Sequence, residues 1–273
     1  MELLHQASTK GRDMETQVAV QGNGNLPANV DTDWGFDNSV SDSDVVIPKL
    51  LLMQKTSQLV DDENSGVSVG DIVRSTSKEI LAKKGGPLEF VPIHQFKTWV
   101  KSDMSSGAPK FAGIEPCSSA NEDLEWEYEE DGKQMRRDMT LNFYVLLKED
   151  LVAHVEAKEK GTTTNLFPCL VSFSRTSYRA GKILATHFFM CGRNRIPVPG
   201  TVYSLSSERK SNDSNSWYTL DVAKVGETDP LLMNECREWW KILHNSANSV
   251  KVDHSDLEEE VGVETVDTKN VDF

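Results

Sequence analysis

The chain lacks any segment of the kind that targets a protein to a membrane or anchors it there. No apolar run approaches the roughly 20 residues that span a bilayer. Residues 1–17 also lack the apolar core of about 7–15 residues that a signal peptide needs. We therefore expect a soluble intracellular protein with no membrane partner.

The sequence also has few of the residue groups that carry catalysis. Its 4 cysteines are widely spaced and form no C-x-x-C pair, which argues against a zinc ribbon and fits a reducing compartment. It contains no phosphate-binding glycine loop, no G-x-S-x-G elbow and no H-E-x-x-H helix. The nearest match is His154-Val155-Glu156 with Pro168-Cys169, which is similar to zinc deaminases, but Ser172 stands where their second cysteine belongs. We therefore expect a protein that is not an enzyme and that needs no metal or cofactor.

Acidic charge is concentrated at the two ends of the chain. The net charge is −14, of which residues 1–46 carry −6 and residues 253–273 carry −7, so residues 47–252 are nearly neutral. Within this body, residues 166–224 hold eight Lys or Arg against three Asp or Glu. The low overall isoelectric point therefore does not exclude an anionic ligand, because the body has a local excess of positive charge.

Both acidic ends are predicted to be disordered. Residues 1–46 contain stretches rich in Gly, Asn, Ser and Asp and show no sustained periodicity, whereas residues 253–273 are too poor in apolar residues to offset their ordering entropy. Residues 253–273 carry eight carboxylates against one cation, Lys269, and have no aromatic residue before Phe273. Such a tail either only solubilises the protein, or competes with nucleic acid for a basic groove and docks on partner proteins. The candidate partner-binding residues are Glu258, Glu259, Glu260, Asp267, Asp272 and Phe273.

Most of the body is predicted to form strands, because short runs rich in β-branched and aromatic residues alternate with turn clusters. These runs are Leu88–Lys101, Leu141–Leu147, Leu166–Phe173, Ile183–Cys191, Thr201–Leu205 and Ser216–Val222. A hairpin is predicted around Asp131-Gly132, a favoured two-residue turn that sets Glu130 opposite Lys133.

Two segments are predicted to be helical. The first is Leu50–Leu59, after Pro48. The second begins at Asp229-Pro230, where Asp is a favoured cap and Pro takes the first helical position. Its apolar residues recur at helical spacing, so we expect this stripe to pack on the sheet. The fold class expected is mainly β, an OB-fold-like barrel with long loops and a C-terminal amphipathic helix.

Two clusters in the body combine cations with aromatic rings. In the first, strand alternation places Lys97, Trp99 and Lys101 on one face. In the second, cations around Tyr178 occupy a turn and lead into the expected strand Ile183–Cys191. Such interleaving is typical of single-strand binding, since rings stack on bases and cations meet phosphates, whereas duplex reading usually needs a presented helix. The second cluster comprises Arg175, Tyr178, Arg179, Lys182, Arg193 and Arg195.

Four features together resemble the single-stranded DNA-binding proteins of lytic bacteriophages. They are the segment Ile47–Val60, the pair Gly70-Asp71, the block Ser172–Lys182 and the acidic tail that ends in Phe273. The resemblance implies an OB fold, residues 172–182 as part of the groove, and residues 253–273 as a regulatory tail. It also implies roles in DNA replication, recombination and repair in the host cell cytoplasm.

The sequence therefore predicts four parts. They are a disordered acidic arm (1–46), an OB-fold nucleic-acid-binding domain (47–227), a helix packed on the barrel (228–246) and a disordered acidic tail (247–273). The function expected is to coat single-stranded DNA without strong sequence preference, while the tail recruits replication or recombination proteins. The alternative is a phage transcription activator or adaptor that acts on host RNA polymerase through its C-terminal region.

Overall fold

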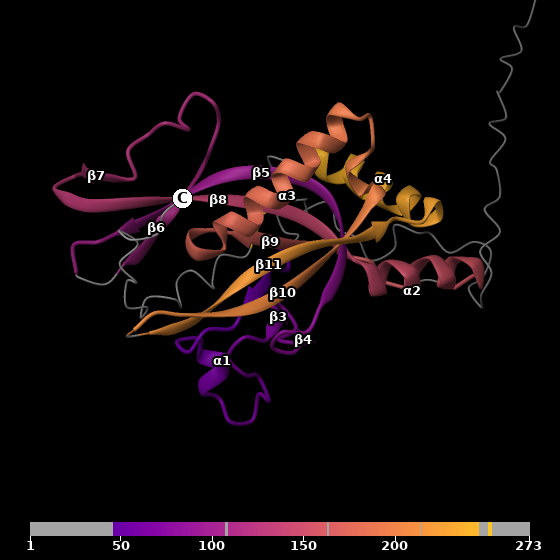
Figure 1. The fold of residues 1–273 in the computed structure, drawn as a ribbon, viewed down its shortest axis with the longest axis horizontal. Helices are drawn as coiled ribbons and strands as arrows, with labels where there is room; N and C mark the ends of the chain where they lie inside the picture. The colour runs from indigo at the N-terminus through magenta and orange to yellow at the C-terminus, as the bar shows by residue number, and fades with distance from the viewer. Residues whose placement is uncertain (1–45, 107–108, 163, 214, 246–250, 253–273) are drawn as a thin grey trace, which may run out of the picture.

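The computed structural model describes residues 46–106, 109–162, 164–213, 215–245 and 251–252. At its centre is a seven-stranded antiparallel sheet with the order β11-β10-β5-β8-β7, in which β6 also pairs with β5 and β9 with β8 (Figure 1). The strands are β5 (Leu88–Asp103), β6 (Lys110–Pro116), β7 (Glu127–Glu130), β8 (Lys133–Leu147), β9 (Cys169–Phe173), β10 (Thr201–Ser211) and β11 (Ser216–Glu227).

The sheet is open. Its long central pair, β5 and β8, runs in register from Phe90 opposite Leu147 to Asp103 opposite Met135, with one shift between Pro92 and His94. Proline has no backbone N–H to donate to a neighbouring strand, which accounts for the irregularity at Pro92. In the described part of the chain β11 and β7 end the order and do not pair with each other. A mainly β fold with a C-terminal helix is confirmed, but the expected OB-type barrel is not observed.

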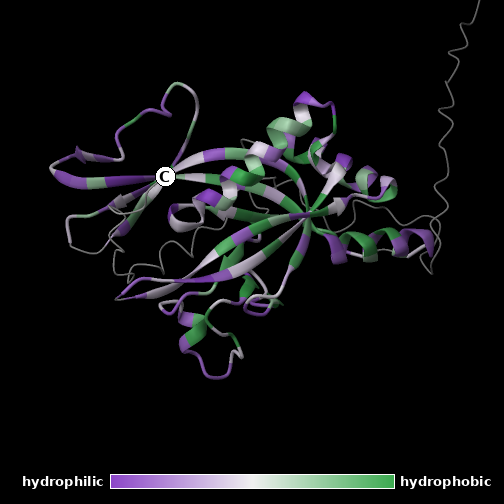
Figure 2. Ribbon diagram, viewed as in Figure 1, coloured by the Kyte–Doolittle hydropathy of each residue, from purple (hydrophilic) through white to green (hydrophobic). Residues whose placement is uncertain are grey.

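Helices cover both faces of this sheet (Figures 1 and 2). On one face α3 (Tyr178–Arg193) packs its buried residues, Ala180, Leu184 and Phe188, on apolar side chains of β5, β8, β9, β10 and β11. On the other face α2 (Lys148–Glu159) and α4 (Pro230–Asn245) bury a second apolar cluster. The large sheet therefore lies between two helical layers.

The C-terminal helix α4 matches its prediction. It begins at Pro230, and the Asp229 carboxylate accepts a hydrogen bond from the backbone N–H of Leu231 at 2.8 Å. Leu232 and Cys236 are buried against the sheet, as the helical spacing indicated. The hairpin around Asp131-Gly132 is also confirmed, with Glu130 opposite Lys133. Beyond α4, β12 (Lys251–Val252) pairs in parallel with β1 (Val46–Ile47).

A small second sheet, β2-β3-β4, lies beside the first (Figure 1). Its strands are β2 (Leu50–Leu52), β3 (Ile72–Arg74) and β4 (Ile80–Ala82). The prediction of a helix over Leu50–Leu59 is wrong, since β2 occupies its start and the short α1 (Gln58–Asp61) begins only later. The reason is that Leu50 and Leu51 pack into different apolar clusters, and burial on both faces suits a strand in an apolar run that periodicity alone leaves ambiguous.

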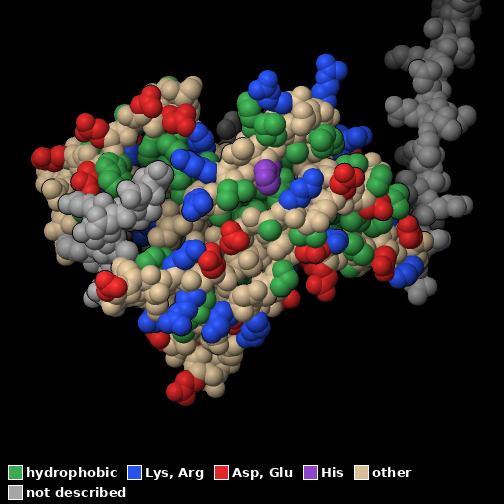
Figure 3. Space-filling view, viewed as in Figure 1, with side chains coloured by type: hydrophobic (Ala, Val, Ile, Leu, Met, Phe, Trp, Pro, Cys, Tyr) green, Lys and Arg blue, Asp and Glu red, His purple; other side chains and the backbone are tan. Residues whose placement is uncertain are grey.

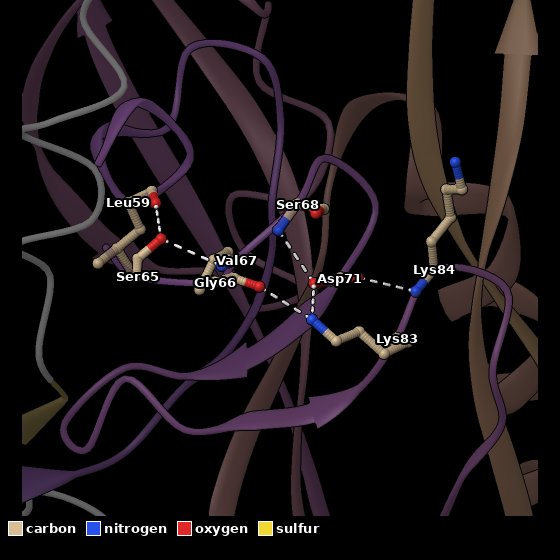
Figure 4. Close-up of polar contacts among 8 residues, drawn as sticks. All are labelled: Leu59, Ser65, Gly66, Val67, Ser68, Asp71, Lys83 and Lys84. Carbon is tan, nitrogen blue, oxygen red and sulfur yellow. Dashed lines mark hydrogen bonds and ion pairs between the residues drawn. The ribbon is translucent and has the colours of Figure 1, made fainter. Parts of the chain in front are cut away.

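Asp71 ties the loop before β3 to the end of β4 (Figure 4). Its carboxylate is 1 % exposed and accepts hydrogen bonds from the backbone N–H groups of Ser68 (3.0 Å) and Lys84 (2.9 Å) and from the Lys83 ammonium (3.1 Å). Burial opposes ionisation, but these donors together lower the pKa of Asp71. Gly70 has φ +92° and packs on the Tyr218 ring, where a Cβ would come within 2.7 Å of a ring carbon. The Gly70-Asp71 pair is therefore a structural requirement of this loop.

The prediction of a strand over Ile183–Cys191 is wrong, because these residues lie in α3. The segment is apolar enough for a buried strand, but its buried residues Leu184 and Phe188 stand four positions apart, which is helical spacing. Gly181 lets the helix approach the sheet, since a Cβ at this position would lie 2.6 Å from the Cβ of Phe173. The close approach of α3 to β9 thus depends on Gly181, which lies in the segment around Tyr178 that the sequence predicts to be a turn.

Replacing Gly181 with alanine is expected to destabilise the protein, although alanine is the better helix former. Helix propensity favours alanine by about 1 kcal/mol, but overpacking of a tight core costs about 1–3 kcal/mol. The cost of overpacking exceeds the gain in helix propensity, so the urea midpoint of Gly181→Ala should fall. Gly192→Ala is the matched control in the same helix: its Cβ meets nothing within 4 Å, so its midpoint should stay the same or rise. Equal shifts of the two variants would contradict the close contact.

Candidate nucleic-acid interface

The outward side of α3 combines cations with exposed apolar side chains. At 3.6 residues per turn, its exposed positions fall on one side of the helix, opposite Ala180, Leu184 and Phe188. No Asp or Glu occurs anywhere in residues 161–207. We call this surface the cationic helix face and define it as Arg179, Lys182, Ile183, Phe189, Met190 and Arg193.

Rings and cations are paired on this face. Phe189 is 64 % exposed, and the Arg193 guanidinium lies 5.9 Å from its ring centroid. The Lys182 ammonium lies 5.1 Å from the ring centroid of Tyr178. Figure 3 shows Lys and Arg side chains on both sides of apolar side chains along the helix. An exposed ring beside a cation provides a surface for stacking a base next to a site for its phosphate.

The cations of this face are not neutralised by the protein. Arg179, Lys182 and Arg193, with Arg195 in the following loop, make no ion pair with any carboxylate in the described ranges of the chain. Arg195 is exposed and has a positive φ of 58°. Four cations therefore remain available to an anionic ligand.

Two other members of the predicted cluster have structural partners. The Arg175 guanidinium donates to the Asp138 carboxylate at 3.0 Å, and Asp138 also accepts from Arg136. The Tyr178 hydroxyl donates to the Met139 sulfur at 2.9 Å, and burial raises the pKa of this tyrosine. Tyr178 is thus bonded to β8 and has the Lys182 ammonium beside its ring, so its ring is not an open stacking surface.

The β5 strip is placed differently from the sequence expectation. Trp99 is only 4 % exposed, and its ring N–H donates to the backbone carbonyl of Asn121 at 3.0 Å, so its face is not open to a base. Alternation predicted the side of the strand on which Trp99 lies, but not that the segment after β6 folds over it. Trp99 is therefore not available to stack on a base.

The two lysines of the strip are paired with carboxylates. Lys97 bonds Glu122, which raises the pKa of Lys97. Lys101 lies 3.0 Å from both Glu115 and Glu130, and these hydrogen bonds raise its pKa. Trp99 stands opposite Met139 of β8, and Met139 contacts Tyr178. Both predicted clusters therefore lie on the face of the sheet that α3 covers.

Three residues of the face were not among the sequence candidates: Ile183, Phe189 and Met190. They lie in the run Ile183–Cys191, which the sequence predicts to be a strand. Their signal was present in Arg179, Lys182 and Arg193, which stand three and eleven positions apart, close to one and three helical turns, and so share one side of a helix.

The deaminase-like residues do not form a site with Cys169. His154 lies on α2, where its Nδ1 is 2.9 Å from the carbonyl oxygen of Thr164 and its Nε2 is 3.5 Å from the Glu235 carboxylate. Cys169 is buried in β9, and burial raises its pKa to about 12. Within the described ranges no three His, Cys, Asp or Glu residues are grouped to hold a metal ion.

The candidate tail residues between Glu258 and Phe273 lie outside the described residues. The same holds for nearly all of the predicted acidic arm, residues 1–46. Among the helices that the structure describes, none is long and apolar enough to cross a membrane.

A family model described as "Pam3 phage gp34-like protein" matches residues 21–249. No curated protein and no solved structure matches the chain.

Proposed function

The chain belongs to the Pam3 phage gp34-like family, and from this premise we propose that it binds single-stranded DNA through the cationic helix face. The observation that carries the proposal is the exposed ring of Phe189 beside Arg193, on a helix that has no acidic residue. Binding of this kind tolerates many sequences, because every base has a face that stacks. A phage protein with this property would coat single strands during replication, recombination and repair.

An exposed basic helix is also the element that duplex-reading proteins place in the major groove. The side chains of this face favour a single strand. Ile183, Phe189 and Met190 stand among the cations, and a ring or thioether there meets unpaired bases better than the polar edges and phosphates of a duplex. Titration of labelled dT oligonucleotide, its RNA equivalent and a duplex of equal length tests the choice. Tighter binding of the duplex would overturn the single-strand assignment.

Salt dependence should report the number of phosphates that the face neutralises. Four free cations, Arg179, Lys182, Arg193 and Arg195, predict that log K falls with log salt at a slope of about −2.8, from about −0.7 per contact. In Lys182→Gln/Arg193→Gln the slope should shrink to about −1.4, with weaker binding at every salt concentration. The measurement is fluorescence anisotropy with oligo-dT between low and physiological salt.

The matched control is Lys158→Gln/Lys160→Gln, which removes two exposed cations at the C-terminal end of α2, one in the helix and one at its cap. This variant should keep the wild-type slope, because α2 covers the opposite face of the sheet. A wild-type slope in the α3 variant as well would show that nucleic acid, if it binds, does so elsewhere.

A further inference from the structure

The segment 122–131 has the opposite character to the cationic helix face. It leads into and forms β7, ends in the turn before β8, and has no Lys or Arg. We call it the acidic segment. Its carboxylates, all exposed, are Glu122, Asp123, Glu125, Glu127, Glu129, Glu130 and Asp131.

Exposed apolar side chains lie among these carboxylates. Leu124 is 45 % exposed and Trp126 is 52 % exposed, with the Arg136 guanidinium 5.1 Å from the ring centroid of Trp126. Glu122 and Glu130 bond Lys97 and Lys101. The other five carboxylates form no ion pair with any residue in the ranges that the structure describes. The segment therefore presents unpaired anions around two apolar groups.

The acidic segment and the cationic helix face are complementary in both charge and apolar content. One offers Trp126 and Leu124 between anions, and the other offers Phe189 and Met190 between cations. Complementary charge speeds encounter and selects orientation, while the apolar groups gain from losing contact with water.

Within one molecule the acidic segment approaches only the start of α3, where Glu122 bonds Lys97 on β5. α3 begins beside β8, where Tyr178 contacts Met139, and it runs to Phe188, which packs on Phe143 and Tyr203. Figure 1 places β7 at one end of the molecule and the C-terminal half of α3 toward α4. A contact between Trp126 and Phe189 therefore has to form between copies.

We propose that the acidic segment of one copy docks on the cationic helix face of a second copy. The two surfaces differ, so one head-to-tail contact leaves an unused surface of each kind, from which a chain or a ring can grow. The inference rests on the proposed function only in that nucleic acid and the acidic segment would then compete for the same face. Single-stranded DNA should therefore dissolve the assembly.

Complementary variants test the contact by sedimentation velocity over a range of protein concentrations. Wild-type protein should associate at low salt and dissociate at high salt. Glu125→Lys/Glu127→Lys and Lys182→Glu/Arg193→Glu should each be monomeric alone. Their 1:1 mixture should associate again, because each changed surface then meets a surface of opposite charge on the other variant. A chain that carries all four changes should associate again.

The control is Glu149→Lys/Glu159→Lys in α2, which changes the net charge as much as the acidic-segment variant and should associate like wild type. Monomeric wild type at every concentration overturns the inference, and so does a mixture that stays monomeric. If deletion of residues 253–273 abolishes association while Glu125→Lys/Glu127→Lys does not, the occupant is the tail and the inference fails. If the protein associates but does not bind oligo-dT, the contact between copies is retained and the proposed function is rejected.

Discussion

Truncation of Phe188 to alanine is expected to lower the free energy of unfolding by about 3–5 kcal/mol. The Phe188 ring is buried between α3 and the sheet, with its centroid 5.4 Å from that of Phe143 in an edge-to-face arrangement. Its loss leaves a cavity at the point where the helix is held. The measurement is the urea midpoint with its slope, and binding of oligo-dT should fall in parallel as the helix loses its position.

Phe189 is the matched control, because it is the next residue in the chain and has the opposite environment. Its exposed ring contributes little to the core, so Phe189→Ala should change stability by less than about 1 kcal/mol. Loss of a stacking ring should nevertheless weaken oligo-dT binding about tenfold, within the range of about 1–3 kcal/mol per stacked base. Unchanged binding in Phe189→Ala would remove the ring from the interface. A large loss of stability would show that the helix is rotated from the arrangement described.

Replacement of Asp71 by alanine is expected to cost about 3 kcal/mol, because it removes the two part-buried hydrogen bonds that the carboxylate accepts from the backbone N–H groups of Ser68 and Lys84. The Lys83 ammonium is mostly exposed and returns to water, so it adds little. Lys83→Met should therefore change stability by less than about 1 kcal/mol. A Lys83→Met variant as unstable as Asp71→Ala would show that the ion pair, and not the two backbone bonds, holds the loop.

Acidic pH should narrow the difference in unfolding free energy between wild type and Asp71→Ala. The pKa of Asp71 is lowered in the folded protein, so its stabilising share is complete above the unfolded value of about 4. That share is lost as the pH falls through the lower folded pKa. The gap in unfolding free energy between wild type and Asp71→Ala should be constant above about pH 5 and should narrow below about pH 4. A gap that widens in acid would contradict the assigned direction.

Local patterns predicted those elements whose signals are local. Strand residues such as Leu88–Lys101, the turn at Asp131-Gly132 and the start of α4 at Pro230 depend on neighbours in sequence, and each is found where expected. The run Ile183–Cys191 was assigned wrongly because its apolar residues satisfy a buried strand as well as a packed helix. Contact with Phe173 across Gly181 decides between the two.

The candidate site was predicted in part. Composition alone determined that the body carries a basic, aromatic stretch between two acidic ends, and it nominated Arg179, Lys182, Arg193 and Arg195, all of which lie on α3 or just beyond it. The tertiary structure decided which rings are exposed: Trp99 is covered by the segment at Asn121, whereas Phe189 faces outward. The physical reason is that charge and local propensity belong to the residues themselves, while the exposure of a ring depends on which distant segment packs over it.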